Sequence, residues 1–330
     1  MITVAADIMG GDNPPELLAE GVFRAVKELD IKAVVVCTEE IKNRLGVLPE
    51  NVSFAISDTF VEMTDEPGVV LKEKKNSSMC LACELTKKGE ADCVVSCGNT
   101  GALFTCASII LRRIKGVRRA ALCSVIPLES PMVLLDCGAN IDATPEILRL
   151  YARMGSAYAE KVVGIENPRV ALLNNGTEPH KGTPLYAETN KRLSSDNTVN
   201  FVGNAEGKSI PFGVCDVLVC DGFTGNIFLK TVEGMAKFMS KNFKKCLTAN
   251  AFTKLGALPS KSKIDALKKS LDPSEYGGAP FLGLAHPVVK AHGNSDAHAF
   301  CSAIKQLVRY KSERVIETIS EAMSSTEETQ

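Results

Sequence analysis

Short apolar segments rich in β-branched residues alternate with longer amphipathic segments along almost the whole of this sequence. The apolar segments have the length and composition of buried β-strands, and the amphipathic ones have the spacing of helices that cover a sheet. This alternation predicts an α/β fold with parallel strands and with helices on both faces of the sheet. We expect strands at Ile2–Ala6, Ala33–Cys37, Val52–Ile56, Cys93–Ser96, Ala121–Ile126, Met132–Asp136, Val170–Leu173, Phe201–Val202 and Val217–Cys220. The clearest helices are expected at Pro15–Leu29, Ser77–Lys88, Thr144–Lys161 and Asn226–Cys246.

The chain of 330 residues is long enough for about two units of about 150 residues each, but no repeat or low-complexity linker divides it. The stretch 248–273 differs in composition, because it is rich in lysine and serine and carries Leu255, Leu258 and Leu267. Two interpretations of this stretch stay open. It is either a solvated helical excursion or a helical tip that touches a membrane or a partner.

Charge and composition exclude several classes of protein. Lys and Arg number 38 against 39 Asp and Glu, Trp is absent and aromatic residues make up only 5%, so we expect no nucleic-acid partner. Most of the 12 cysteines sit in apolar runs, such as the one ending at Cys37, where they act as small hydrophobic residues. The sequence enters a strand without a charged leader, and no apolar stretch approaches the ~18 residues of a membrane span. We therefore expect a reduced, soluble, cytoplasmic protein.

Several predicted strands end in a short turn that combines glycine with amide or hydroxyl side chains. In a parallel α/β sheet such turns gather at the carboxyl edge, where ligands bind. Glycine lets the backbone approach a ligand closely, and a helix that follows offers unpaired N–H groups to an anion. Any one of these segments could be only a tight turn, but their repetition favours a phosphate site. They are Met9–Asp12, Ser96–Gly101, Asp136–Asn140, Asn174–Glu178, Cys220–Asn226 and His292–Ser295.

Other motifs for cofactors and metals are weaker. The segment Gly203–Ser209 resembles a P-loop, but three residues separate its glycines instead of four. No G-x-G-x-x-G follows a predicted strand, which disfavours a dinucleotide site. Cys80 and Cys83 lie on a predicted helix and Cys93 opens a strand, so that with Cys97 they do not form the turns of a typical zinc site. We therefore expect neither a metal nor a cofactor.

The segment from Arg112 to Arg119 carries five positive charges in eight residues. It is either a solvated helix end or an electrostatic docking site for an acidic partner, where such charges mainly raise the association rate. The charged residues are Arg112, Arg113, Lys115, Arg118 and Arg119.

Taken in order, these loops resemble the phosphate acyltransferase family of bacterial lipid synthesis, the acyl-ACP:phosphate acyltransferases. The resemblance covers nearly the whole chain, and the cysteine before Gly98 and the segment after Gly176, with Pro179-His180, depart from the family pattern. The matching blocks are Asp7–Asp12, Ser96–Leu103, Leu134–Asn140, Gly176–Gly182, Asn200–Gly207, Asp216–Lys230, Tyr276–Pro280 and Lys290–Gly293.

The resemblance implies acyl transfer from acyl-carrier protein to inorganic phosphate, which gives acyl phosphate for phosphatidic acid and phospholipid synthesis. It also implies a three-layer α/β/α sandwich like those of isopropylmalate and isocitrate dehydrogenases and phosphotransacetylase. This fold would form one domain over 1–330, with two lobes sharing a cleft and a helical excursion near 248–273, usually as a homodimer. Such enzymes work beside a membrane-embedded glycerol-3-phosphate acyltransferase and can sit on the membrane surface. The alternatives are an acyl-CoA-dependent phosphotransacylase and a noncatalytic regulatory protein that binds acyl-ACP.

Phosphate itself can be the nucleophile, so the reaction needs no activated serine or cysteine. Our hypothesis gives Lys181 the charge that compensates phosphate and makes Asn226 the donor to the oxyanion. His292 could protonate the leaving thiolate, although phosphate or water could do the same, and a capping or solvated histidine is the alternative. The expected phosphate-binding residues are Gly98, Asn99, Thr100 and Gly101. Residues expected to order loops or bind substrate are Asp7, Gly10, Gly11, Asp12, Asn140, Glu178, Asp221, Gly222 and Gly225.

Overall fold

The computed structural model describes residues 1–128, 130–250, 253, 262–263 and 277–327. Most of the expected helical excursion near 248–273 therefore lies outside the described residues. The strands are β1 (Ile2–Asp7), β2 (Ile31–Cys37), β3 (Val52–Ile56), β4 (Cys93–Ser96), β5 (Ala121–Pro127), β6 (Pro131–Leu135), β7 (Arg169–Asn174), β8 (Asn200–Glu206), β9 (Val217–Val219), β10 (Ala279–Leu282) and β11 (Val288–Lys290). The longer helices are α1 (Pro15–Glu28), α2 (Glu39–Leu45), α3 (Ser78–Lys87), α4 (Thr100–Ile110), α5 (Pro145–Tyr158), α6 (Pro184–Ser194), α7 (Gly222–Leu247), α10 (Ala297–Ser312) and α11 (Val315–Glu327). Short turns of 3₁₀- or π-helix are η1 (Pro67–Leu71), η2 (Ala159–Val163) and η3 (Ile210–Phe212).

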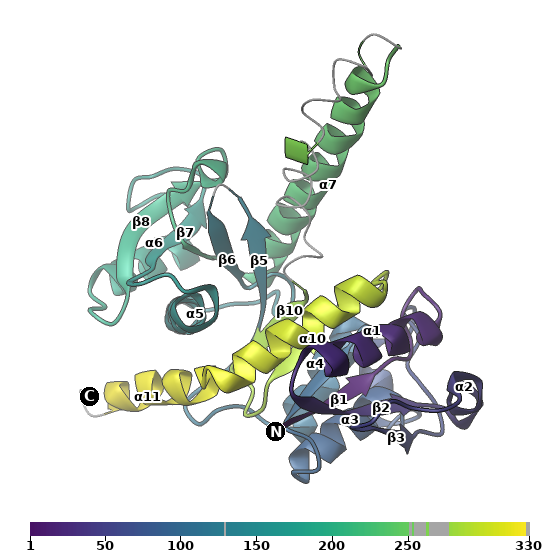
Figure 1. The fold of residues 1–330 in the computed structure, drawn as a ribbon. Coiled ribbons are helices and arrows are strands. Elements are labelled where there is room, and N and C mark those ends of the chain that lie inside the picture. Colours follow the sequence, from purple (N-terminus) through teal and green to yellow (C-terminus); the bar gives the residue numbers. More distant parts are fainter. Residues whose placement is uncertain (129, 251–252, 254–261, 264–276, 328–330) are drawn as a thin grey trace.

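The described strands form one continuous sheet in the order β3-β2-β1-β4-β11-β10-β5-β6-β9-β7-β8. The first lobe contains β3, β2, β1, β4 and β11, and the second contains β6, β9, β7 and β8. Strands β10 and β5 lie between the two lobes (Figure 1). Strands within each lobe run parallel, as the sequence predicts.

The prediction of a wholly parallel sheet is wrong at its centre. There β10 runs antiparallel to both β11 and β5, and β5 runs antiparallel to β6. The reason is local for β5 and β6, because only residues 128–130 separate them and a parallel pair needs a crossover of a dozen or more residues. The two parallel halves are thus joined by an antiparallel bridge.

Each strand predicted from the sequence is present, although β8 extends well beyond Phe201–Val202. The predicted helices are also present, and α7 begins earlier than expected, at Gly222. The sequence did not predict β10 or β11, which are four and three residues long. Pro280 interrupts β10 and Lys290 ends β11, so neither is a continuous apolar segment of the kind that marked the equally short β4 and β9.

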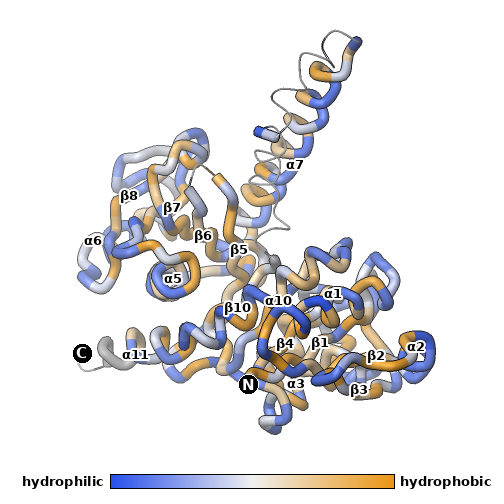
Figure 2. The backbone as a smooth tube through the Cα atoms, viewed as in Figure 1, coloured by the Kyte–Doolittle hydropathy of each residue, from blue (hydrophilic) through white to orange (hydrophobic). Residues whose placement is uncertain are grey.

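The core of the first lobe shows why helices cover both faces of the sheet. Val4 and Ala6 of β1 pack in one cluster with buried residues of α1 and α10, whereas Ala5 packs in another with residues of α3 and α4. Because successive side chains on a strand point to opposite faces, an uninterrupted apolar strand must be covered twice. The strands are accordingly among the hydrophobic parts of the chain in Figure 2.

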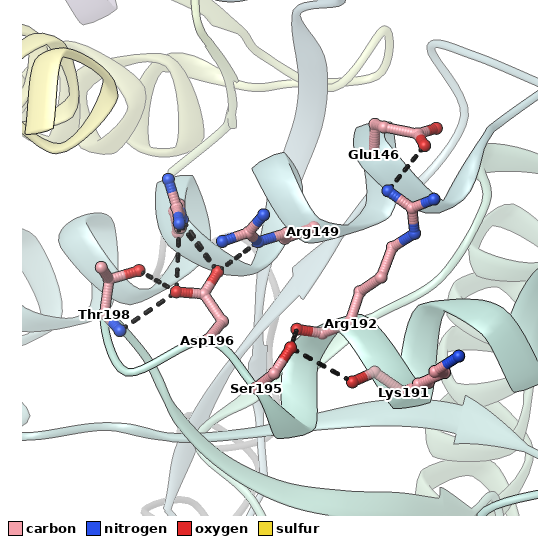
Figure 3. Close-up of polar contacts among 8 residues, drawn as sticks. Glu146, Arg149, Lys191, Arg192, Ser195, Asp196 and Thr198 are labelled. Atoms are coloured by element: carbon pink, nitrogen blue, oxygen red, sulfur yellow. Dashed lines mark hydrogen bonds and ion pairs between the residues drawn. The ribbon is translucent and has the colours of Figure 1, made fainter. Parts of the chain in front are cut away.

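In the second lobe, a buried carboxylate joins α5 to the end of α6 (Figure 3). Asp196 accepts hydrogen bonds from Arg149 Nε over 2.6 Å and from Arg153 Nε over 3.0 Å. Its other partner is Thr198, whose hydroxyl donates over 2.6 Å. Burial opposes the ionisation of Asp196, but the hydrogen bonds from Arg149 and Thr198 outweigh it and hold its pKa at about 2. The group therefore remains a carboxylate that fixes the two helices.

Helix α7 leaves the body of the molecule and projects away from both lobes (Figure 1). Within its 26 residues only Gly222 and Gly225 are buried, both in the first turn. None of the helices in the described part of the chain is both long and apolar enough to cross a membrane.

Candidate functional site

The loops that follow β1, β4 and β11 meet at the carboxyl edge of the first lobe. Asp12 N donates to Gly293 O over 2.8 Å, and Ala291 N donates to Ser96 O over 2.9 Å. The contact is close, because a Cβ atom on Gly11 would lie 2.7 Å from Cys97 Sγ. Three of the turns singled out in the sequence therefore form one surface.

Asp7, at the end of β1, holds the loops after β1 and β4 in place through buried hydrogen bonds. The residue is fully buried; its Oδ2 accepts a hydrogen bond from Ser96 Oγ over 2.7 Å and its Oδ1 accepts one from Met9 N over 3.1 Å. The Ser96 hydroxyl in turn accepts from Gly98 N over 3.1 Å. Burial raises the pKa of Asp7 to about 6, although the hydrogen bond from Ser96 works in the opposite direction. Asp7 thereby sets the start of the loop after β4.

Within the loop from Gly98 to Gly101, Thr100 is the residue that lines the cavity described below. The Asn99 side chain caps α4 by accepting from Ala102 N over 3.0 Å, and its Nδ2 donates to Met63 O and Asp65 O over 3.0 Å each. Gly98 is buried, and Gly101 packs against the ring of Pro67. The Asn99 side chain therefore fastens this loop to the segment 63–65.

In the second lobe, the loop after β6 is organised by Asp136, which we named from the sequence only as the first residue of a turn. Its carboxylate is buried and accepts hydrogen bonds from five donors, which are Leu122 N, Gly138 N, Ala139 N, Asn140 N and Asn140 Nδ2. Asn140 is itself buried, and its Nδ2 also donates to Ala120 O over 2.7 Å. An aspartate at a strand end followed by Gly and Asn was the available signal, because this pattern suits a carboxylate that caps its own turn.

The first turn of α7 packs on this loop. Asp221 caps the helix by accepting from Thr224 N over 2.9 Å, and the Tyr186 hydroxyl donates to Asp221 over 2.6 Å. Gly222 N donates to Asn140 O over 2.8 Å. This seating brings the Asn226 side chain next to Gly138, and within the described part of the chain its amide has no hydrogen-bond partner. The amide is free to donate to a ligand.

A cavity of about 320 Å³ lies between the two lobes, where these loops face one another. One wall is mainly apolar and comes from β5, through Leu122, Val125, Ile126 and Pro127. The polar side chains that line the cavity are Thr100, Ser124, Asn226, Lys230, Glu233, Lys290 and His292. An apolar wall beside several converging polar groups is typical of a small-molecule site.

The cationic groups of the cavity differ in their surroundings. Lys290 is 7% exposed, and its Nζ donates to Cys97 O over 3.2 Å and to Ala291 O. Burial lowers the pKa of Lys290 to about 8 and also lowers the pKa of His292. Lys230 is 60% exposed in its side chain and pairs with Glu233 over 2.9 Å. At neutral pH the cavity therefore contains a buried ammonium beside a mostly neutral imidazole.

The cysteines at the cavity and between α3 and α4 are buried. Cys137 lines the cavity, but burial raises the pKa of its thiol, which donates to Leu122 O over 3.1 Å. Cys80 lies 3.3 Å from Cys106, sulfur to sulfur, between α3 and α4. Across the described residues, no group of three or more His, Cys, Asp or Glu side chains could hold a metal ion.

Lys181 lies on the second lobe and does not line this cavity. Its side chain is exposed and packs over Gly176, and its main-chain oxygen accepts from Asn174 Nδ2 over 3.0 Å. Nearby, Glu178 O accepts from Asn204 Nδ2 over 2.8 Å. This loop borders a second, more open groove of about 680 Å³, whose lining includes Asn174, Gly182, Tyr186, Thr224, Ile227 and Phe228. The first turns of α7 thus have Asn226 on the cavity and Thr224 on the groove.

The basic segment from Arg112 to Arg119 follows α4 and is not helical. It is anchored by the buried side chains of Ile114 and Val117, and Ile114 N donates to Gly283 O over 3.0 Å. All five basic side chains are exposed. Because α4 has 11 residues, about 16 Å of helix separates this segment from Thr100.

Known proteins resemble this chain over almost its whole length. A sequence model of the family described as "Fatty acid synthesis protein" matches residues 2–318. The phosphate acyltransferase of Caldanaerobacter subterraneus subsp. tengcongensis is 43% identical over 325 residues, which cover 98% of each chain. That of Staphylococcus aureus strain bovine RF122 / ET3-1 is 42% identical over 330 residues, 99% of this chain and 100% of the relative.

Two solved structures share the fold at low sequence identity. A phosphotransacetylase from Streptococcus pyogenes aligns with a TM-score of 0.62 at 18% identity, over 96% of this chain and 94% of its own. The 4-hydroxythreonine-4-phosphate dehydrogenase from Klebsiella pneumoniae aligns with a TM-score of 0.55 at 10% identity, over 94% of this chain and 100% of its own. The expected α/β fold, shared with phosphotransacetylase and dehydrogenase-like proteins, is confirmed. The sequence relatives cover the whole chain, and on their account the protein is an acyltransferase that belongs to the phosphate acyltransferase family.

Proposed function

We propose that this protein transfers a fatty acyl group from acyl-carrier protein to inorganic phosphate and so supplies acyl phosphate for phosphatidic acid and phospholipid synthesis. The observation that carries this proposal is the cavity between the lobes, in which Thr100, Asn226 and His292 face an apolar wall. Polar groups suit a phosphate anion and a thioester carbonyl, and the β5 wall suits the start of an acyl chain.

The chemistry needs only the two substrates. A phosphate oxygen attacks the thioester carbonyl carbon, the carbonyl oxygen carries the negative charge, and the C–S bond then breaks to leave acyl phosphate and a thiolate. Holding two reactants in line can lower the barrier by at most ~7–11 kcal/mol. A single well-placed donor to the oxyanion contributes ~2.7–4 kcal/mol. We assign that donor role to the amide of Asn226, which has no hydrogen-bond partner among the residues that the structure describes.

His292 is our candidate proton donor to the thiolate. Because burial lowers its pKa, its protonated form is a stronger acid than an ordinary imidazolium. A thiol with a pKa of about 8.5 then accepts the proton readily. The lowered pKa also keeps His292 mostly neutral at pH 7, so a phosphate proton is the competing source.

We further propose that acyl-carrier protein docks on the exposed basic segment at the far end of α4. The five positive side chains suit an acidic partner, and their distance from Thr100 leaves room for a prosthetic arm to reach the cavity.

A homodimer is the proposed assembly, with α7 as its contact. Its exposed hydrophobic residues are Phe223, Ile227, Met235, Phe238, Met239 and Phe243. Most of these recur at helical spacing, which is the pattern of a face that packs on a second helix. Figure 2 shows hydrophobic and hydrophilic residues alternating along this helix. We place the dimer in the cytoplasm, at the membrane surface and beside a glycerol-3-phosphate acyltransferase that consumes the acyl phosphate.

The decisive test is incubation of the purified protein with acyl-ACP and inorganic phosphate, with acyl phosphate measured directly. We expect acyl phosphate to accumulate with phosphate and not with buffer alone. A parallel reaction with acyl-CoA tests the phosphotransacylase alternative, which predicts equal or faster product formation from that donor. Binding of acyl-ACP without any product would instead support a noncatalytic regulatory protein.

A further inference from the structure

Lys290 is the most buried cation of the central cavity. It is the last residue of β11, a strand that lies between β4 and β10, so its side chain emerges where the two lobes meet. Only 7% of the residue is exposed, yet it lines the cavity.

Among the described residues, the Lys290 ammonium uses two of its N–H donors in hydrogen bonds, and the third is available to a ligand. An ammonium group has three N–H donors and no acceptor. Two of them are directed to Cys97 O and Ala291 O, which are the main-chain oxygens of the loops after β4 and β11. No ion pair joins Lys290 to a carboxylate among the residues that the structure describes. Asp7 and Asp12 favour its charge only from longer range, and a buried ammonium in contact with no carboxylate is costly, so its position suits a negative charge brought by a ligand.

We propose that Lys290 is the cation that anchors inorganic phosphate in this cavity, with its third N–H donating to a phosphate oxygen beside the Thr100 hydroxyl. This inference rests on the proposed function, because it names the residue that holds the proposed nucleophile. It transfers to Lys290 the role that the sequence suggested for Lys181, whose exposed side chain lies on the second lobe outside the cavity lining.

The geometry also explains why Lys230 cannot replace it. Lys230 reaches the cavity from α7, but its side chain is mostly exposed and already paired with Glu233. A solvated, paired cation attracts phosphate less than a fixed and desolvated one. Lys290 is held by two main-chain oxygens, so little side-chain freedom is lost when it binds an anion.

The protonation of Lys290 agrees with this role. Because burial lowers its pKa to about 8, the free enzyme loses the charge on the alkaline side of neutrality, and a bound dianion should favour the charged form. The charged or titratable groups that face Lys290 are Asp7 on β1, Asp12 in the following loop, Cys97 after β4, Lys230 on α7 and His292 after β11.

Substitution tests the anchor directly. Calorimetric titration with inorganic phosphate alone should show that Lys290→Gln weakens binding by about 10- to 100-fold, as expected for one hydrogen bond to a charged group. In turnover the phosphate KM should rise while the acyl-ACP KM changes little, and Lys290→Arg should recover part of the affinity. Lys181→Ala is the competing variant, and Lys191→Gln, an exposed lysine on α6, controls for loss of a positive charge.

The outcomes separate clearly. Unchanged phosphate affinity in Lys290→Gln, or a loss confined to Lys181→Ala, would overturn the anchor. If Lys290→Gln does not fold, the wild-type protein still decides: sulfate, which does not titrate near neutrality, should compete with phosphate below about pH 8 and lose affinity above it. A flat sulfate profile would reject the inference. If phosphate binding depends on Lys290 but no acyl phosphate forms, the proposed function fails and the anion site stands.

Discussion

Gly225 and Asp136 approach so closely that a Cβ atom on the glycine would lie 1.9 Å from the main-chain oxygen of the aspartate. The contact joins the first turn of α7 to the loop after β6. It therefore determines where Asn226, the next residue along the helix, stands relative to Gly138 and the cavity.

Gly225→Ala should reduce acyl transfer strongly. A methyl group there forces α7 away from the loop, which costs about 1–3 kcal/mol of overpacking. A shift of about 1 Å in the donor at Asn226 can cost about 100-fold in rate. The control is Gly234→Ala on the same helix, where a Cβ would meet nothing within 4 Å and Ala should stabilise the helix by about 1 kcal/mol. Equal rates for both variants would contradict the role of this contact.

Ser96→Ala should destabilise the first lobe and disturb phosphate binding. The substitution removes a donor to buried Asp7 and an acceptor for Gly98 N, so we expect a loss of about 1–3 kcal/mol in the free energy of unfolding. Urea denaturation measures the loss, and Ser195→Ala, an exposed serine after α6, is the comparison. A change no larger than that of Ser195→Ala would show that Asp7 does not depend on Ser96.

Asp196→Asn should destabilise the second lobe by about 3–5 kcal/mol, because it removes the buried negative charge that pairs with Arg149 and Arg153. The sign with pH follows from the lowered pKa of about 2. The stabilisation is complete above the unfolded value of about 3.9 and is lost as the pH falls from there through about 2. Thermal unfolding from pH 7 to pH 2 checks this, with exposed Asp142→Asn as control. Parallel pH curves for the wild type and Asp196→Asn would be the contrary result.

Replacing Arg118 and Arg119 with Glu should slow association with acyl-ACP, most strongly at low salt. Opposite charges steer diffusional encounter, and salt screens exposed charges beyond about 10 Å at 0.1 M. The measurement is kcat/KM for acyl-ACP against ionic strength, with Lys87→Glu and Lys88→Glu as the matched double variant at the end of α3. If both pairs behave alike, the docking site lies elsewhere.

Phe238→Asp should dissociate the proposed dimer. A charge in an apolar helix contact is desolvated without a partner, which disfavours association. Sedimentation equilibrium at several concentrations measures the change, and Ser240→Asp places the same charge at another exposed position of α7. A wild-type protein that sediments as a monomer would refute the dimer itself.

The sequence alone predicted most of the strands and the loops of the candidate site. The alternation of apolar segments located β1 to β9, because a buried strand consists largely of apolar residues that the sequence shows directly. Glycine beside amide or hydroxyl groups likewise marked the loops that approach one another, and the resemblance to phosphate acyltransferases is confirmed over the full chain. Both kinds of signal are local.

The order of the strands in the folded sheet determined which side chains line the cavity. Lys290 reads in the sequence as one lysine after two valines, and only the placement of β11 between β4 and β10 buries it at the cavity. The same order leaves Lys181 on the second lobe, outside the cavity lining. The fold also directs the side-chain amide of Asn99 to main-chain oxygens of the segment 63–65. A residue's own neighbours in sequence fix its conformation, whereas its charge and hydrogen-bonding capacity depend on groups that only the folded chain brings within a few ångströms.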